Sequence, residues 1–179
     1  MATATPSPAP NGAAGASDTA LRQFGALRFN ATLGQIVTVM LASPQHRHAF
    51  MTDLEWYALP AIATNQAVIA EQRDKTAAMS GPIAAVLFAS VSAEVDQCLM
   101  ARQDYRLRLK PEEWASGPIP WLVEAIGDAH AANQLVTQLL TQRFKATGMK
   151  AISRGADGKP MVGVLRRSES PQASMRGAA

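Results

Sequence analysis

The best candidates for proton-transfer chemistry in this chain of 179 residues are a histidine in a turn and an acid in an apolar run. His46 lies in segment 43–47, a proline-containing turn between two expected helices. A histidine there can be partly exposed and can accept a proton, as a general base must. The same position is typical of an ordinary surface histidine, so both interpretations stay open. His130 opens an expected helix, where the helix dipole disfavours an imidazolium ion, and we expect it to be structural.

Glu124 is the acid in the apolar run, which covers residues 121–126. An acid among apolar neighbours is costly unless it reaches a partner or faces a cleft. Pairing with a histidine would satisfy the carboxylate and would hold the imidazole in one tautomer. The alternative is an acid on an edge strand that faces outward, and the residues alone do not choose.

The other reactive residue types carry less weight. Cys98 has Val95 and Leu99 as neighbours at helical spacing, so we expect a small core residue and not a nucleophile. No Cys/His spacing suggests a metal site. The basic residues are scattered, which predicts a solvated face, although a subset can form a docking patch for an acidic protein: Arg47, Arg102, Arg106, Arg108, Lys145, Lys150 and Arg154.

Composition restricts the class of protein. A length of 179 residues suits one domain, and 47% hydrophobic residues exclude a wholly disordered chain. A net charge of +3 is too weak to indicate nucleic-acid binding. No apolar run reaches the length of a membrane span, and residues 1–20 lack the pattern of a signal peptide. We expect a folded domain over 21–167, with disordered tails at 1–20, rich in alanine and proline, and at 168–179.

The elements that must position these residues follow from periodicity and turn signals. Helices are predicted at 32–42, 52–59, 92–99 and 129–146, and strands at 67–71, 83–91, 121–126, 150–154 and 161–165. This order predicts an α+β fold, an α/β sandwich with helices flanking a mixed central sheet. The order also resembles the GNAT-type acyltransferase fold. Acyl-CoA enzymes of that fold usually hold pyrophosphate on a glycine-rich turn before a helix. The turn at 88–92, which we expect to correspond, has no glycine.

Several short motifs in a fixed order carry a more specific resemblance. They read Ser-Pro-Gln-His-Arg at 43–47, Leu-Pro-Ala-Ile at 59–62, Glu-Trp-Ala-Ser-Gly at 113–117 and Trp-Leu-Val-Glu at 121–124. With these motifs, the stretch from about 33 to 165 is similar to the RTX toxin-activating lysine acyltransferases, the haemolysin-activating proteins. The chain resembles a divergent member of that family.

This resemblance implies a cytoplasmic enzyme with a GNAT-like fold that moves a fatty acyl chain from acyl carrier protein to internal lysines of an RTX-type protoxin. It implies no bound cofactor and, by family analogy alone, a homodimer. The family's essential histidine falls on His46, and its acidic partner, usually aspartate, falls on Glu124. From the same motifs we expect substrate contacts by Arg47, Asn65, Ser116 and Trp121.

The role of His46 stays open between a general base and a covalent acyl acceptor. The chain departs from the family pattern at Glu124, which is one methylene longer than aspartate, at Tyr57 and at 127–128. Two other functions therefore remain as alternatives. One is a GNAT-like N-acyltransferase for a small amine, and the other is a catalytically lapsed partner that binds an RTX protein.

Overall fold

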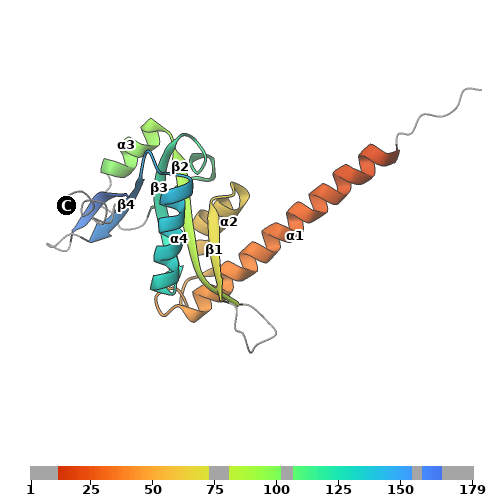
Figure 1. The fold of residues 1–179 in the computed structure, drawn as a ribbon, viewed down its shortest axis with the longest axis horizontal. Coiled ribbons are helices and arrows are strands. Elements are labelled where there is room, and N and C mark those ends of the chain that lie inside the picture. Colours follow the sequence, from red (N-terminus) through yellow and green to blue (C-terminus); the bar gives the residue numbers. More distant parts are fainter. Residues whose placement is uncertain (1–11, 73–80, 102–106, 155–158, 167–179) are drawn as a thin grey trace, which may run out of the picture.

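A five-stranded mixed sheet forms the centre of the computed structural model, which describes residues 12–72, 81–101, 107–154 and 159–166. The strands lie in chain order (Figure 1), and each pairs antiparallel with the next except for the parallel third and fourth strands. They are β1 (Ala67–Gln72), β2 (Gly81–Val91), β3 (Ile119–Gly127), β4 (Met149–Arg154) and β5 (Pro160–Leu165).

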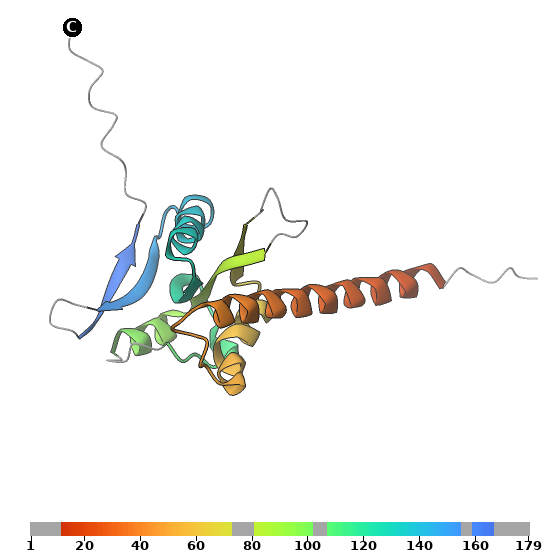
Figure 2. The ribbon, with the colours of Figure 1, turned by 90° about the horizontal axis from the view of Figure 1, so that it is seen from below.

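Helices cover both faces of this sheet, as Figure 2 shows. They are α1 (Gly12–Ala42), α2 (Leu54–Ala63), α3 (Ala93–Ala101) and α4 (Ala129–Gln142), with short 3-10 turns at Met51–Asp53 and Pro111–Glu113. Side chains alternate along β2, so Leu87 and Ala89 pack with α1 and α2, whereas Val86 and Phe88 pack with α4. The predicted α+β class and the predicted order of helices and strands are confirmed.

The first helix is longer than predicted, because it begins at Gly12 and not near residue 32. It includes 12–20, which composition assigned to a disordered tail; 1–11 and 168–179 lie outside the described residues. The segment 12–42 contains no proline and seven alanines, which allows a continuous helix despite its four glycines. Both views show this end of α1 projecting from the sheet (Figures 1 and 2), with Leu21, Phe24 and Leu27 exposed.

By length and composition alone, the stretch Asp18–Ala42 of α1 is also apolar enough to cross a membrane, although no uninterrupted apolar run in the sequence predicts a span. Its last turns are core, because Ile36, Val39 and Met40 are buried against the sheet and α2. Packing in the domain therefore accounts for part of the apolar character of this helix.

Three other boundaries differ from the prediction. Helix α2 continues through Pro60 to Ala63, because the Thr64 backbone N–H and hydroxyl both donate to the Pro60 carbonyl and complete the last turn. Helix α4 ends at Gln142, and the chain then turns until Gly148, whose φ of 69° suits glycine. Strand β3 begins at Ile119, before the predicted start at residue 121.

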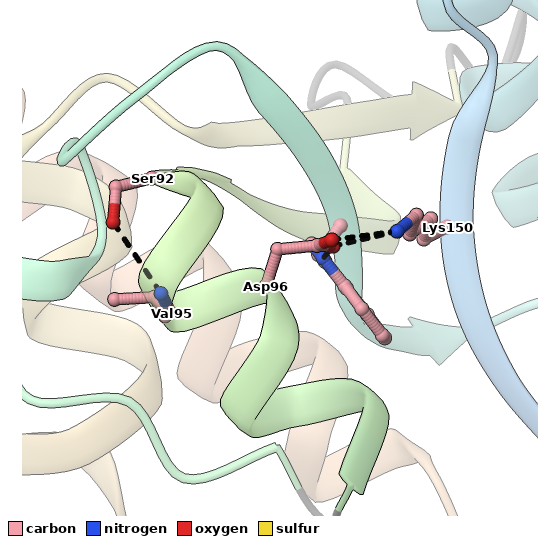
Figure 3. Close-up of polar contacts among 5 residues, drawn as sticks. Ser92, Val95, Asp96 and Lys150 are labelled. Carbon is pink, nitrogen blue, oxygen red and sulfur yellow. Dashed lines mark hydrogen bonds and ion pairs between the residues drawn. The ribbon is translucent and has the colours of Figure 1, made fainter.

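Helix α3 joins β3 and β4 through one carboxylate. Asp96 accepts hydrogen bonds from the Lys150 ammonium at 2.7 and 2.8 Å and from Trp121 Nε1 at 2.9 Å. Figure 3 shows Asp96 on α3 directed at Lys150, and Ser92, just before α3, accepting a hydrogen bond from the Val95 N–H. The hydroxyl of Ser92 also lowers the pKa of Glu94. Trp121 and Lys150 are the paired residues of β3 and β4, so Asp96 bonds both strands at the point where they pair.

Replacing this carboxylate should destabilise the fold. Asp96→Ala leaves the buried Trp121 N–H without its acceptor and the Lys150 ammonium without its partner, so we expect a loss of about 2 kcal/mol in the free energy of unfolding. Urea denaturation followed by circular dichroism measures it. The control is Asp18→Ala, which removes an exposed ion pair to Arg22 and should cost less than about 0.5 kcal/mol. Equal losses in the two variants would contradict the role of Asp96.

Candidate functional site

His46 is held in place by the turn that follows α1. The N–H groups of His46 and Arg47 both donate to the Ser43 carbonyl, at 3.1 and 2.9 Å. A hydrogen bond of 3.0 Å joins Ser43 Oγ and His46 Nδ1, and Ser43 is itself buried. One ring nitrogen is therefore fixed by the turn, and the other, Nε2, is directed away from it.

A β-bulge in β3 turns the Glu124 side chain toward the face of the sheet that α1 and α2 cover. Leu87 pairs with Glu124 whereas Phe88 pairs with Leu122, so Val123 is an extra residue. Residues paired across two antiparallel strands lie on the same face, and Leu87 faces α1 and α2. Glu124 therefore shares the face of Val123, although strict alternation would place the two on opposite faces.

The turn and the bulge bring the two predicted catalytic residues together. His46 Nε2 lies 3.4 Å from Glu124 Oε1, with 15% of the histidine side chain and 35% of the acid side chain exposed. The ring is thus oriented by Ser43 on one nitrogen and faces a carboxylate at the other. Such a pair can accept a proton on the imidazole and stabilise the resulting cation.

The pair borders a cavity of about 570 Å³ with charged and aromatic walls. Sequence reasoning missed most of this wall, which includes Asp53, Trp56 and Arg108. Asp53 accepts a hydrogen bond from Trp56 Nε1 at 3.3 Å, and the Arg108 guanidinium lies 5.3 Å from the centre of the Trp56 ring. Arg108 stands between two leucines, Leu107 and Leu109, that are buried. This alternation is the sequence pattern that could have placed Arg108 at the wall.

The four residues predicted to bind substrate do not gather at this pair. Arg47 is exposed beside His46, and Asn65, with a φ of 55°, borders a separate cavity of about 90 Å³. Ser116 Oγ accepts a hydrogen bond from the Ser92 N–H and donates one to the Glu113 carbonyl. Trp121 is fully buried on Asp96. Neither Ser116 nor Trp121 lines the cavity beside His46 and Glu124.

Two further expectations concern reactive groups. Cys98 is exposed, so its prediction as a core residue is wrong: α3 buries the side of Leu99, and Cys98 lies one residue out of that face. Arg102 and Arg106, which belong to the proposed basic patch, lie outside the described residues. Among residues that the structure describes, no group of three His, Cys, Asp or Glu side chains gathers as a metal site.

The model of the RTX toxin acyltransferase family matches residues 26–166. This range includes His46, Glu124 and, apart from the first turns of α1, every α-helix and strand of the described residues. No curated protein matches the chain.

Proposed function

Since this chain belongs to the RTX toxin acyltransferase family, we propose that it transfers a fatty acyl group from acyl carrier protein to lysine side chains of an RTX-type protoxin. The acyltransferase class and the RTX toxin substrate follow from membership. The lysine acceptor, the carrier-protein donor and the cytoplasmic location are part of the proposal. The observation that carries it is the pair of His46 and Glu124, 3.4 Å apart at the wall of a cavity.

In the proposed reaction, Glu124 attracts the ammonium of the acceptor lysine toward His46. With its Nδ1–H donated to Ser43 Oγ, His46 has a free Nε2 lone pair that removes one proton from the ammonium. The amine then attacks the thioester carbonyl, so that a C–N bond forms and the C–S bond breaks. The second amine proton ends on the departing thiolate, and His46 returns its proton to water. Glu124 stabilises the imidazolium in between.

The donor preference is supported by the N-terminus of α4. The parallel strands show that β3, α4 and β4 form the crossover unit, so the turn that would hold a nucleotide pyrophosphate is Gly127–Asp128 and not the glycine-free turn before Ser92. Asp128 Oδ1 already accepts the Ala131 N–H at 2.8 Å. A carboxylate at this position repels a pyrophosphate, which favours a donor carried by a protein over coenzyme A.

The proposal is tested by incubating the chain with acyl-loaded carrier protein and a candidate RTX protein, followed by mass mapping of lysines. Acyl mass shifts on internal lysines are expected. Transfer from acyl-CoA to a free small amine, without a protein acceptor, would favour the small-amine alternative. Tight binding of the RTX protein without any transfer would favour the lapsed partner. An acyl group trapped on His46 in the absence of acceptor would replace the general-base route with a covalent one.

Neutralising the carboxylate of the pair should slow transfer without unfolding the protein. Glu124→Gln keeps the size of the side chain but removes the charge that attracts the ammonium and stabilises the imidazolium, so we expect a loss of about tenfold to a hundredfold in the rate. Glu55→Gln, on the exposed first turn of α2, is the matched control and should keep the wild-type rate. Initial rates of lysine acylation measure both. A Glu124→Gln rate equal to the control would remove Glu124 from the mechanism.

A further inference from the structure

A second cavity adjoins His46 and differs in character from the first. Its volume is about 340 Å³, and it shares Gln45 and His46 with the charged cavity. Its other walls include Ala125 of β3 and Ala129 and Ala132 of α4. We name this cavity the alanine groove, after those three residues.

The alanine groove and the charged cavity lie toward opposite faces of the sheet. Ala125 pairs with Val86, which packs with α4, whereas its neighbour Glu124 pairs with Leu87, which packs with α1 and α2. Beyond the pair of Trp121 with Lys150, no further β4 residue pairs with β3 in the part of the chain that the structure describes. His46 therefore stands beside an unpaired edge of β3, where both faces can be reached.

The walls of the two cavities also differ in charge. Of the described residues that line the alanine groove, His46 alone is titratable, whereas the charged cavity has Asp53, Arg108 and Glu124 besides its histidines. Past Pro44 and Gly127 the groove adjoins a hollow of about 400 Å³ that is bordered by Pro82 and Ile83. Asp128 borders this hollow as well, so the stretch without charged side chains runs along the alanine groove and ends where the hollow begins.

We propose that the alanine groove holds the acyl chain of the donor, while the charged cavity receives the acceptor lysine. The inference rests on the proposed function and names where each substrate lies. An acyl chain needs a wall without charges, and a lysine ammonium needs carboxylates, and these two surfaces meet at His46. Because residues 125, 129 and 132 are alanines, the groove has room for the acyl chain. The size of these three side chains therefore sets the longest acyl chain that the enzyme transfers.

Ala129→Leu is the test, because Ala129 is exposed at the first position of α4 and a leucine there preserves the helix. We expect transfer of a 16-carbon acyl group from carrier protein to fall by about tenfold or more, with an 8-carbon group transferred within about twofold of the wild-type rate. Ala125→Leu, on the strand side of the groove, should act in the same direction. Ala26→Leu, on the exposed part of α1, is the matched control and should change neither rate.

Binding of a 16-carbon fatty acid, followed by calorimetry, gives a second readout that does not need transfer, and Ala129→Leu should weaken it about tenfold. If both groove variants keep the wild-type preference for acyl-chain length, the groove does not hold the acyl chain. The same conclusion follows if the transfer rate falls equally for 8-carbon and 16-carbon groups. A wild-type chain that transfers no acyl group, but binds the fatty acid in a manner sensitive to Ala129, would refute the proposed function and keep the groove.

Discussion

His46→Ala is expected to lower the rate of lysine acylation by about 10²- to 10⁴-fold, the range that general acid–base catalysis contributes. The substitution removes the ring whose Nε2 faces Glu124, but it leaves the Ser43 turn, the bulge and both cavities in place. The fold should therefore keep its stability while transfer stops. Initial rates with acyl-loaded carrier protein, measured by mass spectrometry, and urea denaturation of the same variant separate these two effects.

The chain provides a matched control for this substitution. His130 lies exposed on α4, bonded to Gln134 one turn further along, and His130→Ala should keep the rate within about twofold of wild type. A His46→Ala rate within tenfold of His130→Ala would show that His46 is not the base. Retained binding of the RTX protein by the inactive His46→Ala variant would place the defect in chemistry and not in recognition.

Gly127→Ala should destabilise the fold strongly. Gly127 ends β3 with a φ of 91°, and an added Cβ would lie 2.2 Å from the Ile83 carbonyl oxygen and 2.5 Å from Val39 Cγ1. Backbone strain and the clash with a rigid carbonyl together predict a loss of about 3 kcal/mol or more in the free energy of unfolding. Urea denaturation measures it.

Gly163→Ala is the control, because a Cβ there meets no heavy atom within 4 Å and its backbone φ lies outside the positive range. We expect a change of less than about 1 kcal/mol, since alanine replaces glycine in a strand without strain. Equal stability of the two variants would mean that the end of β3 relaxes freely, and the position of Ala125 and His46 beside it would then not be rigid.

The sequence predicts a helix or strand correctly where the element buries one apolar face. It fails where local backbone geometry or pairing between strands determines the boundary of the element. The apolar run of β2 and the stripe of α4 were sufficient to identify both elements. The early part of α1 was missed, because an alanine-rich segment needs no buried face to form a helix. Proline predicts that α2 ends near residue 59, but the helix continues to Ala63, where the Thr64 N–H and hydroxyl both donate to the Pro60 carbonyl.

The sequence named candidates for the site without showing their geometry. The motif resemblance pointed to His46 and Glu124, which the structure brings to 3.4 Å, yet alternation along β3 does not show which face Glu124 takes. The face of Glu124 depends on Val123, the extra residue of the bulge, which has no paired residue on β2. Neither the composition nor the apolar pattern of β3 predicts this bulge. Ser43 was quoted as part of a motif, and only its distance to Nδ1 shows that it orients the ring.

Across the residues that the structure describes, one residue pair joins β3 to β4, so the contact between the first three strands and the last two is narrow. The hairpin of β4 and β5 is attached by Trp121 and Lys150, by the Asp96 carboxylate, and by side chains such as Met149 and Ile152. It can therefore open as a sub-global unit while β1, β2 and β3 keep their backbone hydrogen bonds. Opening of the hairpin would free this edge of β3 along its whole length, next to His46.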